Sequence, residues 1–200
     1  TGVSVTPGVN NATSQAVFAK YGQDLEKCAK ANKLKADFSA CKDHEEKALV
    51  LLAASYSAGI DIIDASDIGI ALQLEAKRML SEKPNNRFRL KGIAGGGGKG
   101  QRILPSANSY EGATLEDKVE KAAAIVPSLV LECLIELKTN GVGDNKNVLI
   151  EMNIDTTRHQ EIQVIGNGEW CVTMGGRDCS LQMHEQKLLE VSVTEEELNE

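Results

Sequence analysis

The pattern of hydrophobic and polar positions changes its period part-way along the chain. Residues 13–82 are rich in Ala, Leu, Lys and Glu and contain no proline, which predicts that they are mostly helical. A helix from Thr114 to about Leu137, broken or kinked at Pro127, is expected later in the chain. From residue 87 onward, short segments predict strands at 87–93 (RFRLKGI), 99–104 (KGQRIL), 147–154 (NVLIEMNI), 159–166 (HQEIQVIG) and 169–176 (EWCVTMGG).

Capping signals divide the helical part. Asp43 and Glu46 form a capping-box pattern ahead of an apolar run, and Gly59 is a plausible end for that helix. Ser66 or Asp67 is expected to cap the next helix, because short polar side chains satisfy the free N–H groups of a first turn.

Turn signals are placed between the strands and at both ends. Residues 1–8 (TGVSVTPG) are expected to form a short strand closed by a Pro-Gly turn. An Asn-Gly turn at 167–168 is expected to join the last two strands. Thr194 and Glu197 form another capping box, so a helix is expected to begin there.

Neither the carboxylates nor the cysteines form a pattern typical of a metal site. Asp61, Asp64 and Asp67 lack the Gly and the distal Glu of a calcium loop, so capping and solvent roles are favoured. The five cysteines contain no CxxC pair, which argues against a zinc ribbon and a disulfide framework. A reducing, cytoplasmic setting is therefore expected.

The charge balance excludes some classes of partner. The chain has 200 residues, of which 42% are hydrophobic and 26% charged, and its net charge is −7. This argues against nucleic-acid binding through overall charge. Residues 183–200 hold six Glu and one Lys, so most of the excess is local. No apolar run approaches the roughly 18 residues of a membrane helix.

The glycine run at 95–100 (GGGGKG) is the first candidate for chemistry. A Walker A loop is excluded, because Gly100 follows Lys99 where a Ser or Thr is needed. A dinucleotide fingerprint is disfavoured, because a strand rather than a helix follows the run. A flexible linker is the plain alternative. The flanking strands favour a glycine hairpin over a triphosphate, with Lys91 neutralising phosphate charge.

The second candidate is the dense polar stretch at 158–190. His159, Glu161 and Gln163 share one face of a strand, because strand side chains repeat every two residues. A solvent-facing strand is an equal alternative. Residues 177–180 (RDCS) could be a turn with an internal ion pair, and residues 182–187 could be an exposed segment.

Together these two stretches closely resemble the biotin carboxylase component of biotin-dependent carboxylases, which belongs to the ATP-grasp superfamily. The resemblance rests on LKGIAGGGGKGQRI at 90–103 and on RHQEIQVIGNG, GRDCSLQ and QK at 158–187. It is weak over 1–8 and absent over 9–86. Gly176 before the RDCS motif is similar to large multidomain acetyl-CoA carboxylases, which implies a role in fatty acid biosynthesis.

The resemblance implies an α+β fold in two parts. Residues 1–154 would form the ATP-grasp lid subdomain, an antiparallel sheet with helices that carries a helical insertion at about 9–86. Residues 155–200 would begin the main, C-terminal ATP-grasp lobe. The chain would thus be a middle fragment of a larger enzyme.

The resemblance also implies a role for particular residues. The nucleotide-binding set would be Lys91 at the phosphates, Gly95, Gly96, Gly97 and Gly98 in the closing loop, Glu151, Met152, Asn153 and Ile154 in the hinge around adenine, His159 at the nucleotide, Gln182 beside the phosphates, and Glu185 in place of a nucleotide-contacting His. Lys187 would be the catalytic residue that holds bicarbonate.

The implied reaction uses ATP and bicarbonate to carboxylate biotin on a carrier, by way of carboxyphosphate. The implied partners are a biotin carboxyl carrier and a carboxyltransferase component, and a homo-oligomer is possible for the parent protein. Neither nucleic acid nor a membrane is expected as a partner. The Mg²⁺ ligands are expected outside this chain, so the fragment alone is expected to be inactive.

Departures from the family pattern leave two alternatives open. Glu185 replaces a His, and Met183 and His184 replace two Arg, so positive charge is lost near the expected phosphates. Another ATP-grasp ligase, or a degenerate non-catalytic domain kept for assembly, would also fit these residues.

Overall fold

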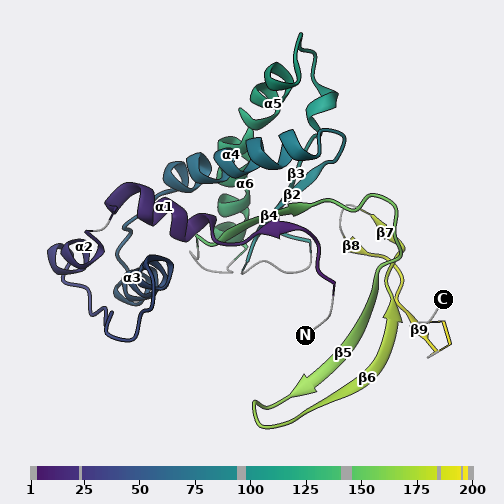
Figure 1. The fold of residues 1–200 in the computed structure, drawn as a ribbon. Helices are drawn as coiled ribbons and strands as arrows, with labels where there is room; N and C mark the ends of the chain where they lie inside the picture. Colours follow the sequence, from purple (N-terminus) through teal and green to yellow (C-terminus); the bar gives the residue numbers. More distant parts are fainter. Residues whose placement is uncertain are drawn as a thin grey trace. The chain divides into compact units, whose positions relative to one another are not determined.

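The chain forms two separate units in the computed structural model (Figure 1), Thr1–Asn153 and Ile154–Glu200. The structure describes residues 4–22, 24–93, 98–140, 146–183, 186–194 and 196–197. Helices and antiparallel strands are both present, which confirms the expected α+β class. Within the described ranges, no helix is both long enough and apolar enough to cross a membrane.

The first unit combines helices with one antiparallel sheet. Its sheet has the order β1-β4-β2-β3, with bounds Gly8–Val9 (β1), Val148–Met152 (β4), Phe88–Gly92 (β2) and Gln101–Leu104 (β3). Its helices are α1 (Ala12–Tyr21), α2 (Leu25–Ala31), α3 (His44–Ala58), α4 (Ala65–Glu82), the 3₁₀ helix η1 (Ala107–Ser109), α5 (Leu115–Ala123) and α6 (Val126–Thr139).

Alternation along the strands decides which face of this sheet carries the helices. Phe88, Leu90 and Gly92 of β2 are buried, and across the strands they pair with Met152, Ile150 and Val148 of β4. Helix α6 packs against β2 and β3, and α4 packs against α6. The intervening residues of β2, Arg89 and Lys91, therefore lie on the opposite face, which is the face that matters for the site.

Most helix ends follow the predicted signals. Asp43 caps α3 by accepting from the N–H of Glu46, and Gly59 ends that helix in the left-handed conformation. Thr114 caps α5, and the expected break comes just before Pro127, which lies in the first turn of α6.

The predicted cap of α4 is wrong. Asp64, rather than Ser66 or Asp67, is the capping residue. Its side chain accepts from the N–H of Asp67, and the Asp67 carboxylate accepts from the N–H of Asp64 at 2.9 Å. Asp67 is thus the second half of a capping box, three residues inside the helix.

Lys146 connects the helices to the sheet from its place just before β4. Its side chain is almost fully buried, donates to the carbonyl of Ile63 at 3.3 Å, and forms an ion pair with Asp61. Its backbone carbonyl accepts from Thr13 of α1, and its N–H donates to the hydroxyl of Tyr56 of α3. One residue therefore holds α1, α3 and the α3–α4 connection.

The second unit is built of strands. Strands β5 (Gln160–Gly166), β6 (Cys171–Asp178) and β9 (Val191–Val193) form an antiparallel sheet in the order β5-β6-β9. Strands β7 (Gln182–Met183) and β8 (Gln186–Lys187) form a separate pair. The register of β5 and β6 shifts between Ile162 and Val164, next to Gly175 with its positive φ.

Two end and turn predictions differ in detail, and a third lies partly outside the described residues. The first strand is Gly8–Val9 rather than residues 1–8, of which residues 1–3 lie outside the described part. The Asn-Gly dipeptide begins a longer turn, because Gly166 pairs with Cys171 and the Asn167 side chain accepts from the N–H groups of Glu169 and Trp170. The Thr194–Glu197 capping bonds are both present, but residues 198–200 lie outside the described part.

Candidate functional site

The nucleotide candidates of the first unit lie on the sheet face away from α6. Lys91 of β2 forms an ion pair with Glu151 of β4, and both side chains are partly exposed. Arg89, directly across from Glu151, donates to Asn153 Oδ1 at 2.9 Å and to Gln101 Oε1 at 2.8 Å. Two cations, Arg89 and Lys91, thus lie on the same face as Glu151.

The predicted hinge has part of its backbone already engaged. The N–H of Met152 donates to the carbonyl of Pro7 at 2.8 Å, and the N–H of Asn153 donates to the carbonyl of Arg87 at 2.9 Å. These two donors hold β1 and β2 in place. A nucleotide base at this hinge would therefore have to use other groups of residues 151–154.

The glycine hairpin has a narrow neck where β2 ends and β3 begins. The N–H of Gly92 donates to the carbonyl of Gly100 at 2.9 Å. Leu137 of α6 packs against both glycines, and a Cβ on Gly100 would lie 2.5 Å from its Cδ2 atom. Glu136 accepts from the N–H of Gly100 at 3.0 Å and from Arg102 at 2.7 Å, so α6 fixes the base of the hairpin.

The structure describes the loop above this neck only at its two ends, up to residue 93 and again from residue 98. Gly95, Gly96 and Gly97 of the predicted set lie outside the described residues. Gly98 has φ +79°, a left-handed conformation that favours glycine.

Glu161 is the centre of a charged cluster in the second unit. Its carboxylate accepts from Lys187 of β8 at 2.6 Å and from the guanidinium of Arg177 of β6. Arg177 also donates to Glu190, whose carboxylate lies 3.8 Å from the Lys187 ammonium. The hydrogen bond from Lys187 lowers the pKa of Glu161, and the same bond raises the pKa of Lys187.

The other candidates of this unit lie close to one another. The side-chain amide of Gln182 lies 2.5 Å from Nδ1 of His159, and it donates to the carbonyl of Cys179 at 2.8 Å. The structure thus brings His159 next to Gln182, and it pairs Lys187 with Glu161, two positions along the chain from His159. Glu185 lies outside the described residues, and Ile154 is exposed.

The alternative of an ion pair inside residues 177–180 is not what the structure shows. Arg177 pairs with Glu161 and Glu190, whereas Asp178 accepts from Arg158 at 2.7 Å. Successive strand residues point to opposite faces, so neighbours at the end of β6 find different partners.

We expect the carboxyl group of Asp178 to titrate at about pH 2. Hydrogen bonds from the side chain and the N–H of Ser180, followed by the one from Arg158, lower its pKa from 3.8 to about 2. Its stabilising contribution is complete above pH 3.8 and is lost as the pH falls through about 2. NMR titration of Ser180→Ala should move the midpoint towards 3.8, while Ser192→Ala should leave it unchanged. A midpoint near 3.8 in the unaltered chain would contradict this.

The described residues contain no cluster of side chains typical of an all-protein metal site. Among them, no three His, Cys, Asp or Glu side chains converge as metal ligands would. Asp64 and Asp67 are used by the α4 cap, and Asp61 pairs with Lys146.

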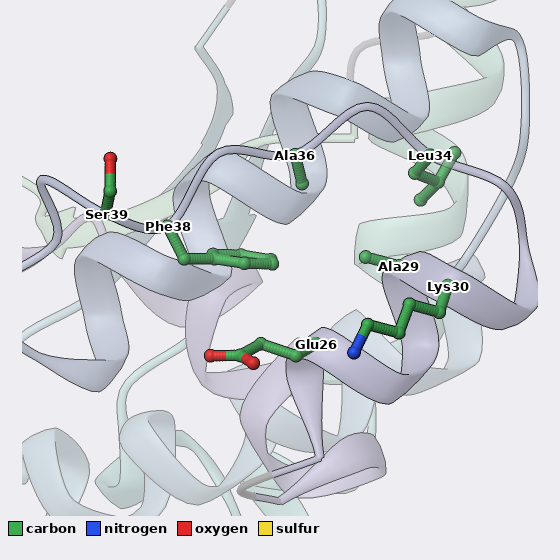
Figure 2. Close-up of a pocket in the computed structure, with 7 residues that line it drawn as sticks. All are labelled: Glu26, Ala29, Lys30, Leu34, Ala36, Phe38 and Ser39. Carbon is green, nitrogen blue, oxygen red and sulfur yellow. The ribbon is translucent and has the colours of Figure 1, made fainter.

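A pocket in the helical part contains none of the predicted site residues. Figure 2 shows its lining from α2 and the segment that follows, with the Lys30 ammonium and the Glu26 carboxylate on one side and Phe38 on the other. The pocket encloses about 380 Å³.

Comparison with known proteins places most of the chain in one family. Residues 54–196 match the family described as "Carbamoyl-phosphate synthase L chain, ATP binding domain". The chain belongs to this family. The matched residues of this ATP-binding domain include both Lys91 and Lys187. They also include residues 54–86, where the motifs alone carried no resemblance.

Curated relatives agree with the predicted resemblance to biotin carboxylases. The chain is 33% identical to pyruvate carboxylase of Bacillus subtilis, over 68% of this chain and 10% of that protein. It is 26% identical to biotin carboxylase of Haemophilus influenzae, over 70% of this chain and 27% of that protein. It is 26% identical to biotin carboxylase of Nostoc, over 94% of this chain and 37% of that protein. The chain thus spans between a tenth and about a third of the length of these relatives.

A solved structure of the same kind also matches. A crystal structure of a biotin carboxylase–βγ-ATP complex from Campylobacter jejuni is 26% identical and covers 92% of this chain and 36% of its own, with a TM-score of 0.43. The family assignment and the curated relatives together confirm the resemblance to a biotin carboxylase of the ATP-grasp type.

Sequence reasoning missed three residues of these clusters. Arg89 could have been found, because alternation places it on the same strand face as Lys91. Arg177 and Glu190 could not be paired from the sequence, because their contact depends on the register of β6 and on the chain after β8.

Proposed function

We propose that this chain is the central part of a biotin carboxylase, which uses ATP and bicarbonate to carboxylate biotin through carboxyphosphate. Family membership supports an ATP-binding role. The observation that carries the proposal is the position of Lys91, at the neck of the glycine hairpin and on the sheet face away from α6.

The first unit would bind the phosphates of ATP. Lys91 is a compact point charge at the end of β2, and Arg89 adds a second cation two residues away on the same face. Lys91 is paired with Glu151 in the structure, so a phosphate would take over part of that interaction. We propose residues 1–154 as the lid part and residues 155–200 as the start of the main lobe.

The second unit would hold bicarbonate. Lys187 is held by its hydrogen bond to Glu161. His159 and Gln182, which belong to the same two sequence motifs, contact each other. In the proposed reaction, a bicarbonate oxygen attacks the γ-phosphorus of ATP and the bond to ADP breaks. Carboxyphosphate then decomposes to CO₂ and inorganic phosphate, and a ureido nitrogen of biotin gives up its proton to the phosphate and captures the CO₂. The side chains named here position the anion and offset its charge.

The remaining parts of the reaction are proposed to lie elsewhere. Mg²⁺ ligands, the biotin carrier and the carboxyltransferase would be supplied outside residues 1–200. We therefore expect these 200 residues alone to show no bicarbonate-dependent ATP hydrolysis. Acetyl-CoA as the final acceptor is supported only by Gly176, since the relatives include pyruvate and 2-oxoglutarate carboxylases.

The test is an ATP titration of the chain and of Lys91→Ala. We expect Lys91→Ala to weaken ATP binding by about tenfold or more, because a hydrogen bond to a charged group contributes about 1.5–3 kcal/mol. Isothermal titration calorimetry measures the dissociation constants.

The matched control is Lys35→Ala, which removes the same charge from the connection between α2 and α3. Lys35→Ala should bind ATP as the unaltered chain does. Equal weakening by both variants would mean that only net charge matters. If neither the unaltered chain nor Lys91→Ala bound ATP, the alternative of a degenerate, non-catalytic domain would be favoured.

A further inference from the structure

Two cations and two carboxylates form a ring in the second unit that has no net charge. Arg177 contacts Glu161 and Glu190, and Lys187 contacts the same two carboxylates. A bicarbonate ion that bound at Lys187 would therefore meet a neutral cluster. Electrostatic attraction would favour it only after one of the two carboxylates had moved away.

The two carboxylates are held differently. Glu161 belongs to strand β5, its side chain is 27% exposed, and it makes close contacts with both cations. Glu190 lies in the segment between β8 and β9, is 39% exposed, and reaches Lys187 only at 3.8 Å. Glu190 has one close contact, the hydrogen bond from Arg177, whereas Glu161 has two, so Glu190 is the less firmly held of the two carboxylates.

The Glu190 carboxylate also has the chemistry of the expected ligand. A carboxylate and a bicarbonate ion both present planar, paired oxygens to a guanidinium and an ammonium group. Arg177 has a further donor available, because its buried Nε atom has no hydrogen-bond partner among the described residues. An unpaired buried donor is unfavourable, so another acceptor oxygen at this position would be stabilised.

We propose that Arg177 and Lys187 together form a binding site for a planar oxyanion of the bicarbonate type, and that Glu190 occupies this site as an internal competitor. The inference rests on the proposed role of Lys187 and extends it, by adding Arg177 as a second ligand and Glu190 as a regulator of occupancy. Bicarbonate binds when the Glu190 carboxylate swings out, while Glu161 keeps Lys187 in position.

The experiment is a titration with sodium bicarbonate at pH 8 and constant ionic strength, followed by ¹H–¹⁵N NMR of residues 177–190. Glu190→Gln should bind bicarbonate about three- to fivefold more tightly than the unaltered chain, because an exposed ion pair of up to about 1 kcal/mol no longer competes. Glu190→Gln combined with Lys187→Met should show no saturable binding.

Two matched variants separate occupancy from general electrostatics. Glu161→Gln removes the same charge from the same ring, but it should not tighten binding, because it also releases Lys187. Glu169→Gln removes a carboxylate from the β5–β6 turn, at the opposite end of the strand pair from Arg177, and should change nothing.

The bicarbonate dissociation constants of these variants test the inference separately from ATP binding. Equal tightening by Glu190→Gln and Glu161→Gln overturns it, as does an unchanged dissociation constant in Glu190→Gln. No saturable binding by Glu190→Gln also overturns it, while ATP binding that depends on Lys91 would leave the proposed function standing. Binding that persists without Lys187 would refute the assigned role of that lysine.

Discussion

Replacing Gly100 with valine is expected to lower the free energy of unfolding of the first unit by about 3 kcal/mol. Gly100 has φ +70°, which costs an L-residue roughly 1–2 kcal/mol. Its new Cβ atom would also lie 2.5 Å from Leu137 Cδ2, and Leu137 is only 2% exposed. Overpacking of this kind costs about 1–3 kcal/mol. Urea unfolding followed by far-UV circular dichroism measures the loss, because all the described helices belong to this unit.

Gly59→Val is the matched control for the crowding at Leu137. Gly59 has φ +65° at the end of α3, and nothing lies within 4 Å of an added Cβ atom. Gly59→Val should therefore lower the free energy of unfolding only by the roughly 1–2 kcal/mol that backbone strain costs. If the two variants lost the same stability, Leu137 would have room to move and the neck of the hairpin would not be tightly packed.

Replacing Lys146 with alanine is expected to cost about 2–3 kcal/mol of stability. The side chain is 10% exposed, so its buried stem is lost, and the carbonyl of Ile63 loses its donor. Lys146→Met keeps the apolar stem and should cost only about 1 kcal/mol. The same urea unfolding measurement compares the two.

Asp61→Asn tests the ionic part of this contact alone. The side chain of Asp61 is 63% exposed, so its ion pair with Lys146 should contribute less than about 1 kcal/mol. A loss of stability in Asp61→Asn as large as that in Lys146→Ala would show that charge pairing, rather than the buried stem, holds the helices to the sheet.

Local signals predicted most of the first unit well. The caps at Asp43 and Thr114 and the break before Pro127 depend on residues within one turn of each other, so the sequence contains the whole cause. The cap of α4 was misplaced because Asp64 and Asp67 are both good capping residues. Only their reciprocal hydrogen bonds decide which one stands outside the helix.

Local sequence signals could not predict the charged ring of the second unit. Alternation placed His159 and Glu161 on one strand face, but it could not supply their partners. These partners lie 16 to 26 positions further along the chain, and the shifted register near Gly175 changes which residues of β6 face the two side chains. The family motifs located Lys187, whereas its proximity to Glu161 and Glu190 is visible only in three dimensions.

The contacts of Lys146 also set the order in which the first unit can fold. Thr13 and Lys146 are 133 positions apart, and Gly8 pairs with Glu151. Such pairings between distant parts of a chain slow folding, because a long loop must close before they form. During synthesis, the helices of residues 12–82 are made well before the residues that anchor them. Their core-facing side chains therefore lack the sheet until residue 151 has been made, and during this interval the exposed apolar surface is open to chaperone binding and aggregation.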